Sequence, residues 1–356
     1  MFNPTKISTA LLGIVGFKNP YNPKYAIVNS QNQLSKSGLF VTDNAFAKIE
    51  VLKETQDFQD ITDENFNDIL VNMQKASIVN VCSQVFNDSS YIDRNLIYTK
   101  ALNKTDVETL PDGFYGYRIR VENEKDIAFK ITRVLLDFDG TGDFELLLFN
   151  TAKKEPIQTK TISITTDHQV VKLDWVCDNS DDTYKGDYYI GYISTGLTIK
   201  PFKRNYLDSI VMSLITHLEI TKVFVAGQSD NNLFNLNTVQ FPYATSGLNF
   251  DITVYDDFTD LIIQNQSLFA RCIYLDMVIS FLHTYSTTLR SNRSERISEE
   301  IVNRALMEIE GFNNSSGLNI KGLKPQLSKE IGQLRNEIDK LKRGYFGNEI
   351  MVITQE

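Results

Sequence analysis

Seven consecutive residues in the middle of the chain have the composition of a metal-binding loop. The run Asp137–Asp143 (DFDGTGD) offers oxygen ligands at its first, third, fifth and seventh positions, with a glycine at the sixth. Ca²⁺ prefers oxygen ligands at this spacing, and an EF-hand loop adds a bidentate glutamate at position twelve. Position twelve is Leu148, and both flanks are rich in strand-forming residues. A β-hairpin turn is therefore the favoured interpretation, and a calcium site is the alternative.

A second candidate is a serine that could act as a nucleophile. Ser229 lies in the run Phe224–Asp230 (FVAGQSD), which resembles the first block of SGNH-type sialate acetylesterases, where a Gly-Gln-Ser-Asn run presents the nucleophile. That mechanism needs a downstream histidine to activate the hydroxyl. Only His283 follows Ser229, and Ser280 stands where the expected Asp-x-x-His run requires aspartate. A turn that leaves a strand is therefore the favoured interpretation of this segment.

The other residue types that bind metals or carry out redox chemistry are few and scattered. The three histidines and three cysteines include no CxxC pair: His168, His217, His283, Cys82, Cys177 and Cys272. This spacing predicts no motif-type zinc site, and a sparse, odd set of cysteines is typical of a reduced, cytosolic protein. The sequence also contains no Walker loop, GxGxxG, HExxH or GxSxG run. We therefore expect no catalytic residue, metal or cofactor, and a protein that is not an enzyme.

Length, composition and charge limit the class of protein. The 356 residues suffice for about two domains. The fractions of hydrophobic (42%) and charged (23%) residues are typical of globular proteins rather than of disordered chains. A net charge of −9 disfavours broad contact with nucleic acid, although it leaves room for a local basic patch. The longest apolar stretch, Ile273–Leu282, contains Asp276 and is too short to span a membrane.

Two further groups of residues could bind a ligand or a partner. Arg290, Arg293 and Arg296 lie between two predicted helices, where guanidinium groups could pair with phosphates or with carboxylates of a neighbouring subunit. In an acidic chain, ion pairs within or between subunits are the favoured interpretation. A set of tyrosines could stack on a sugar if exposed, although strand alternation turns about half of such a set into the core. These are Tyr184, Tyr188, Tyr189 and Tyr192.

Residues 1–87 are expected to form an extended arm followed by one helix. Proline and glycine are frequent near the N-terminus, and the apolar run Ala10–Phe17 resembles a signal peptide only loosely, because no cleavage site follows it. We expect this run to dock onto a core or onto a neighbouring chain. From about Asp63 to Phe86 apolar residues recur at helical spacing behind Thr62 or Asp63 as the N-cap, which predicts a helix.

Residues 88–204 have the pattern of a β domain. Turn residues separate six runs with strand character, at 115–121, 129–138, 144–149, 159–165, 170–175 and 187–193. Short strands at this spacing predict an antiparallel β-sandwich with the size of one jelly-roll or immunoglobulin-like unit.

Residues 205–356 are expected to be mainly helical. Helices are predicted at 206–218, 256–287, 298–309 and 325–343; 220–225 is a strand or a helix continuation, and 227–257 is a loop. The last helix carries apolar residues in steps of four and three, here named the heptad seam: Leu327, Ile331, Leu334, Ile338 and Leu341. The seam could pack on its own domain or on a partner subunit. The apolar run Ile350–Thr354 is predicted to be a terminal strand.

The predicted fold class is therefore α+β, with a central antiparallel β-sandwich followed by a mainly helical domain and preceded by an extended N-terminal arm. Four segments, in this order, also resemble a known class of viral protein. They are Leu12–Pro20 (LGIVGFKNP), Ser37–Val41 (SGLFV), Gly247–Asp260 (GLNFDITVYDDFTD) and Thr287–Arg296 (TTLRSNRSER). The chain resembles virion structural proteins of tailed phages that infect Bacteroidota, crAss-like phages included. The resemblance implies a protein of the virion, made in the host cytoplasm.

Together these patterns predict a non-enzymatic structural protein that forms a homo-oligomeric ring in the neck or tail and joins neighbouring particle components. The arm, the seam and the terminal strand are segments that bury best against another chain. Expected partners are further copies of the chain and virion proteins of the portal, neck or tail; no membrane is expected, and nucleic-acid contact is disfavoured. The alternative is a glycan-binding adhesin or tail-fibre component that uses the β-sandwich. The third hypothesis is an esterase that uses Ser229.

Overall fold

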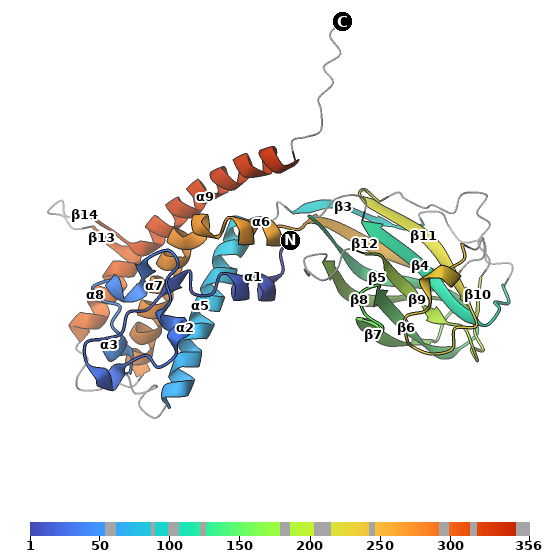
Figure 1. Cartoon of the computed structure of the whole chain (residues 1–356), viewed down its shortest axis with the longest axis horizontal. Helices are drawn as coiled ribbons and strands as arrows, with labels where there is room; N and C mark the ends of the chain where they lie inside the picture. The colour runs from blue at the N-terminus through green and yellow to red at the C-terminus, as the bar shows by residue number, and fades with distance from the viewer. Residues whose placement is uncertain are drawn as a thin grey trace, which may run out of the picture. The chain divides into compact units, whose positions relative to one another are not determined.

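The structure is a computed structural model of the chain, and it divides into two compact units (Figure 1). It describes residues 1–53, 62–86, 90–98, 107–121, 126–178, 186–202, 215–241, 246–291, 299–313 and 319–346. The β unit comprises Met1 and residues 90–260. The helical unit comprises residues 2–89 together with residues 261–356, so it is built from both ends of the chain.

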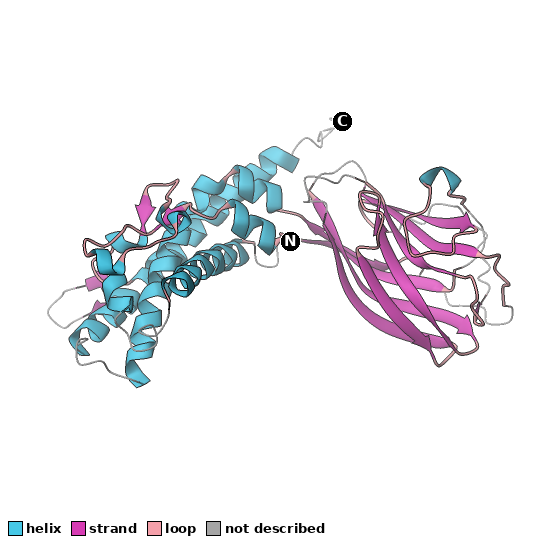
Figure 2. Ribbon diagram, turned by 60° about the horizontal axis from the view of Figure 1, so that its bottom comes forward, coloured by secondary structure: helices cyan, strands magenta, loops and turns pink. Residues whose placement is uncertain are grey.

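Two antiparallel sheets form the β unit, and they face each other in Figure 2. The strands of the first sheet are β3 (Tyr91–Leu96), β5 (Ile127–Asp139), β8 (His168–Asp178), β10 (Lys200–Pro201) and β12 (Leu248–Asp256). In this sheet β5 pairs with β8 and β12, and β12 also pairs with β3. The second sheet has the order β11 (Leu218–Ala226), β4 (Gly113–Val121), β9 (Tyr188–Ile193), β6 (Gly142–Asn150) and β7 (Gln158–Ile164).

One hydrophobic core lies between the two sheets. Alternate residues of β5 and β12, such as Phe129 and Phe250, belong to the same buried cluster as Tyr117 of β4 and Ile190 of β9. Gly116 and Gly191 are opposite each other in the β4–β9 pair, where a Cβ atom on either glycine would collide with the facing backbone. The core therefore depends on alternating side chains from both sheets and on one close backbone approach.

The run Asp137–Asp143 connects the two sheets. The preceding strand β5 belongs to the first sheet, whereas β6 pairs with β7 and β9 in the second. Gly140 in this connection has a φ of 95°, a backbone conformation that favours glycine. The predicted hairpin is therefore wrong, because the two flanking strands do not pair with each other.

The β unit continues past residue 204, where the sequence predicted a helical domain. β11 shows that the ambiguous run 220–225 is a strand, and it pairs along its whole length with β4. β12 lies inside the predicted loop 227–257 and occupies a position between β5 and β3. The sheets recruit both strands because their alternate apolar residues complete the core. Most of the predicted helix 206–218 lies outside the described residues.

Helices dominate the helical unit. They are α1 (Pro4–Ala10), α2 (Ser30–Gln33), α3 (Ile49–Lys53), α5 (Asp63–Val85), α7 (Gln266–Ser291), α8 (Glu299–Glu310) and α9 (Leu323–Phe346). α7 packs against α5, α8 and α9. Short segments between them form the parallel pair β1 (Val15–Gly16) and β2 (Leu39–Phe40), and the antiparallel pair β13 (Gly311–Asn313) and β14 (Asn319–Lys321). Single 3₁₀ turns are η1 (Pro23–Tyr25) and η2 (Val41–Asp43) here, and η3 (Leu236–Thr238) in the β unit.

Two predicted helices show how local sequence sets helix ends. α5 confirms the helix predicted after Thr62, whose hydroxyl accepts a hydrogen bond from the Asn65 N–H at 3.3 Å. The helix predicted over 256–287 is instead two helices, α6 (Thr259–Gln264) and α7. They are separated at Asn265, whose side-chain amide donates to the Leu261 carbonyl at 2.8 Å. The Asn265 N–H also donates to the Leu261 carbonyl, at 3.1 Å, so one carbonyl accepts both bonds at the junction of the two helices.

The coarse fold class is confirmed, because the chain combines helices with antiparallel sheets. The order of the parts differs from the prediction. The helical unit combines residues 2–89 with residues 261–356, and the β unit lies between these two segments in the sequence. One helical segment in the described residues, Gln266–Thr284, is long and apolar enough to cross a membrane. Its side chains Phe269, Ile273 and Phe281 are buried in the helical unit, as expected for a core helix.

Candidate functional site

The N-terminal run Ala10–Phe17, expected to dock onto a core or onto a neighbouring chain, lies in the core of its own helical unit. Leu11, Ile14, Val15 and Phe17 are at most 2% exposed, and the Phe17 ring lies 6.1 Å from that of Phe281. The predicted extended arm is therefore wrong. The run docks onto its own core because it is continuously apolar and short enough to lie between the helices.

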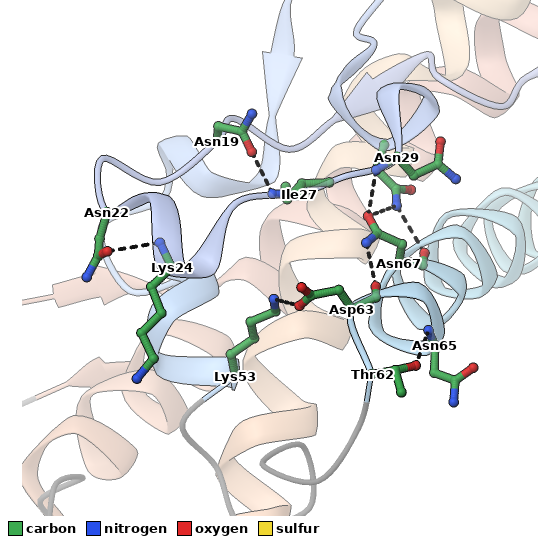
Figure 3. A network of polar contacts seen from close by, with 11 residues as sticks. Asn19, Asn22, Lys24, Ile27, Asn29, Lys53, Thr62, Asp63, Asn65 and Asn67 are labelled. Carbon is green, nitrogen blue, oxygen red and sulfur yellow. Dashed lines mark hydrogen bonds and ion pairs between the residues drawn. The ribbon is translucent and has the colours of Figure 1, made fainter.

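Buried amide side chains hold this segment against α5. Asn32 donates to the Asn67 carbonyl at 3.0 Å, and Asn67 Nδ2 donates to the Asp63 carbonyl at 2.6 Å. Asn67 Oδ1 accepts from the Asn29 N–H. Gln74, two turns further along α5, donates from Nε2 to Asn32 Oδ1. Figure 3 shows Asn67 and Asn29 at the centre of this network. The side-chain amides of Asn32, Asn67 and Gln74 each have a partner, so these three amides are buried without being left unsatisfied.

The heptad seam faces its own unit as well. Leu327, Ile331, Leu334 and Ile338 are between 1% and 7% exposed, and α9 packs against α5, α7 and α8. Of the two alternatives for the seam, the structure supports packing within one chain. The predicted strand Ile350–Thr354 lies outside the described residues.

A surface with exposed charged and aliphatic side chains lies on the outer side of the first sheet. The strand register places Lys130 of β5 opposite Val176 of β8 and Thr253 of β12, and Thr253 opposite Arg94 of β3. In a neighbouring row, Arg133 is opposite both Lys172 of β8 and Asp251 of β12. The basic face is here the set of Arg94, Lys130, Arg133, Lys172, Asp174 and Asp251, with the flanking Val170 and Val176.

One buried carboxylate orients the two arginines of the basic face. Asp251 is 3% exposed and accepts from Arg94 Nε at 3.0 Å, from Arg94 Nη2 at 2.7 Å and from Arg133 Nε at 2.8 Å. Hydrogen bonding from Arg94 lowers the pKa of Asp251 and raises that of the arginine, while burial of the carboxylate opposes this effect. The guanidinium groups are about half exposed, and the Nη groups of Arg133 have no partner among the described residues.

The second carboxylate of the basic face is Asp174, which reaches the face through a bulge. The register between β5 and β8 shifts at this point, and Asp174 has a positive φ of 58°. Its oxygens lie 2.9 Å from Lys130 Nζ and 2.7 Å from Lys172 Nζ. The Lys172 ammonium lowers the pKa of Asp174. The face thus holds four cations, each paired with Asp251 or Asp174, and the strand register places two further carboxylates, Asp178 of β8 and Asp137 of β5, on the same side of the sheet.

The outer sides of the two sheets differ in what covers them. On the second sheet, Phe234 packs on Phe114 at a ring distance of 4.9 Å and on Tyr189 at 5.2 Å, and a second hydrophobic cluster forms there. On the first sheet, Val170 and Val176 are 59% and 39% exposed. Exposed aliphatic side chains beside half-exposed arginines have the composition of a protein-binding surface.

The helical unit contains a groove of about 590 Å³. Side chains from α5, α7 and α9 line it, including Asn80, Asp276, His283 and Lys324. Asp276 accepts from Asn80 Nδ2 at 2.7 Å, and burial raises its pKa. His283 is seven residues further along the same helix, which is about 10 Å, so the two side chains cannot form a catalytic pair across a hydrogen bond.

The other predicted site residues are not assembled into a reactive centre. Ser229 is exposed, and no hydrogen bond in the described residues joins it to a histidine. Asp137 of the candidate calcium loop is paired with His168 at 2.6 Å, and the described residues include no group of acidic, histidine or cysteine side chains arranged to hold a metal. Burial raises the pKa of Cys82 and of Cys272 to about 12, which removes both as thiolate nucleophiles at neutral pH.

The predicted sugar-stacking and arginine groups are likewise not brought together. Tyr188 and Tyr192 point into the shared core, and Tyr189 is covered by Phe234 on the outer side, so these three rings are buried. Tyr184 lies outside the described residues, as do Arg293 and Arg296. Arg290 lies on α7, near its end.

The comparisons identify no relative: no protein-family model, no curated protein and no solved structure matches the chain.

Proposed function

We propose that this protein is a non-enzymatic structural component of a phage virion, which forms a homo-oligomeric ring in the neck or tail and contacts portal, neck or tail proteins. In this proposal the β unit is a β-sandwich that presents a rigid contact surface. The observation that carries it is the basic face, where the exposed Val170 and Val176 lie on the same side of the sheet as two arginines oriented by the buried Asp251. Such a surface suits protein contact because its charged groups are already held in place.

The resemblance of four sequence segments to virion structural proteins supports the viral part of the proposal. The reactive side chains provide little support for catalysis, because Ser229 and His283 belong to different units and the buried thiols are protonated at neutral pH. The glycan-binding alternative loses its main support, since Tyr188, Tyr189 and Tyr192 are buried.

Quantitative mass spectrometry of purified virions from the phage that encodes the chain tests the proposal. The protein should be present at a fixed copy number per particle through successive density-gradient steps, as structural proteins are. A non-structural protein of the same infected cells serves as the control for contamination. Loss of the chain together with that control during purification would contradict the proposal.

A further inference from the structure

One hydroxyl in the core of the β unit has no hydrogen-bond partner. Tyr192 of β9 is 1% exposed, and its ring packs on those of Phe138 and Phe144 at centroid distances of 5.7 and 5.0 Å. The buried Oη of Tyr192 forms no hydrogen bond with any described residue. Burial raises the pKa of Tyr192 well above its ordinary value, so the phenol keeps its proton and remains a donor. A buried donor without an acceptor is unfavourable, which indicates that a bound group supplies the acceptor.

A small pocket of about 70 Å³ adjoins this side chain and is here named the Tyr192 pocket. Three aliphatic side chains that belong to the core or pack against it line the pocket: Leu110, Leu197 and Ile199. Glu108, Thr109 and Lys200 line it as well, and the last two are exposed, so the pocket reaches the surface. The negative charge of Glu108 contributes to the raised pKa of Tyr192, as expected if the hydroxyl end of the ring lies toward the pocket.

Backbone hydrogen bonds fix the walls of the Tyr192 pocket. The Glu108 N–H donates to the Pro201 carbonyl at 2.9 Å, which joins the segment 107–110 to β10. After β9, the Leu197 N–H donates to the Ser194 carbonyl at 3.1 Å and closes a turn. A ligand would therefore enter a pocket that already has its shape, without first having to order a loop.

Size and wall chemistry restrict what can occupy the pocket. A cavity of about 150 Å³ holds benzene, so a pocket of about 70 Å³ suits a group of about three non-hydrogen atoms. The charges of Glu108 and Lys200 offset each other, which favours a neutral group over an ion. The group needs an oxygen that accepts from Tyr192 and an apolar part that contacts the aliphatic walls. An acetyl group has both, whereas water would leave those walls without apolar contact.

The exposed part of the lining favours a sugar over an acetylated peptide as the carrier of the acetyl group. Thr109 and Lys200 carry a hydroxyl and an ammonium group, which can form hydrogen bonds with the hydroxyls of a sugar ring. An acetylated lysine would instead place its four-carbon chain beside these polar groups, where it gains no apolar contact.

We propose that the Tyr192 pocket binds the acetamido group of an N-acetylated amino sugar, with the Tyr192 hydroxyl donating to the acetyl oxygen. This recognition uses the hydroxyl of a buried tyrosine rather than the stacking of an exposed ring on the sugar. The site is additional to the proposed structural role and does not depend on it.

Saturation-transfer NMR of the full-length protein, with N-acetylglucosamine as the probe, tests the proposal. The acetyl methyl protons should receive the strongest saturation, because they lie deepest in the pocket. Glucose, which lacks the acetamido group, and N-acetyl-lysine should both give weaker signals. Tyr192→Phe removes only the hydroxyl and should weaken the binding of N-acetylglucosamine about tenfold. Tyr188→Phe on the same strand is the control and should leave binding unchanged, because the Tyr188 hydroxyl donates to the Asp178 carbonyl at 3.0 Å.

The melting temperatures of the two variants provide a second readout. Tyr192→Phe should melt at or above the wild-type temperature, because it removes an unpaired donor, whereas Tyr188→Phe should melt lower. A lower melting temperature for Tyr192→Phe would show that the hydroxyl is paired inside the protein and would overturn the proposal. Equal binding of N-acetylglucosamine by wild type and Tyr192→Phe would also overturn it, as would the absence of a signal from every probe, which would leave a pocket that holds only water. Stronger binding of N-acetyl-lysine than of N-acetylglucosamine would overturn the sugar as the ligand.

Discussion

At the residue scale, two buried aspartates have opposite effects on stability. Asp251 lies between Arg94 and Arg133, and their hydrogen bonds lower its pKa, whereas burial raises the pKa of Asp276. A carboxyl whose pKa is lowered on folding stabilises the fold once it is ionised, and one whose pKa is raised destabilises it. Replacement by asparagine should therefore lower the stability of the protein at Asp251 but not at Asp276.

Asp251→Asn should lower the free energy of unfolding by about 1–3 kcal/mol at neutral pH, because two guanidinium groups lose their shared carboxylate. The stabilisation is present above the ordinary carboxyl pKa of about 3.9 and is lost as the pH falls through the lower folded-state pKa. The difference between wild type and variant should therefore close below about pH 4. Urea unfolding at several pH values measures this, with the exposed Asp143→Asn as the control; a pH-independent difference would argue against the arginine contacts.

Asp276→Asn should leave stability unchanged or raise it at neutral pH. The raised pKa of Asp276 means that its ionised form is disfavoured in the fold, so wild-type stability should increase as the pH falls through that pKa toward the ordinary carboxyl value. An asparagine oxygen can still accept the hydrogen bond from Asn80. Thermal melts between pH 4 and pH 8 should show a flatter profile for the variant. A large loss of stability at pH 7 would show that the carboxylate is paired.

At the element scale, the sequence predicts local structure well and pairing poorly. α5 was predictable because its apolar residues recur at helical spacing behind a threonine cap, and both properties are local. β12 was predictable in principle: Leu248, Phe250, Ile252 and Val254 alternate with polar residues. The surrounding asparagines hid this signal. No local pattern states that β12 pairs with β3, or that β5 and β6 belong to different sheets.

The candidate site, the basic face, could likewise be predicted from the sequence only in part. Alternation along β5 and β8 places Lys130 and Lys172 on the outer side, and this much follows from the sequence. The convergence of Arg94 and Arg133 on Asp251 depends on the register among three strands that lie far apart in the chain. The sequence left open whether the N-terminal run docks onto its own core or onto a neighbouring chain for a related reason, since Gln74, which accepts from the Gly13 N–H, lies on a helix far along the chain.

Phe17→Ala should cost about 3–5 kcal/mol of stability in the helical unit, because it removes a fully buried ring that packs beside Phe281. Urea unfolding followed by the helical circular dichroism signal measures this loss. Tyr21→Ala, at a fully exposed position four residues away, should change stability by less than about 0.5 kcal/mol. Equal effects of the two substitutions would indicate that the N-terminal segment is not part of the core.

At the scale of the whole molecule, the β unit is continuous in sequence while the helical unit is not. A fragment of residues 90–260 contains every described strand of both sheets, and it should show dispersed amide signals in an NMR spectrum. A fragment of residues 88–204, bounded as the sequence first suggested, lacks β11 and the central strand β12. It should be unfolded or aggregated, because β3 loses its pairing strand. A well-dispersed spectrum from the shorter fragment would contradict the observed sheet order.

The proposed function requires copies of the whole molecule to assemble with one another. Light scattering of the full-length protein, measured across a concentration series at low and at high salt, tests this most directly. The average mass should rise with concentration past that of a dimer, as expected for subunits of a ring, and any charged contact between copies would make it fall at high salt. A mass that stays at that of one chain under all of these conditions would contradict the account.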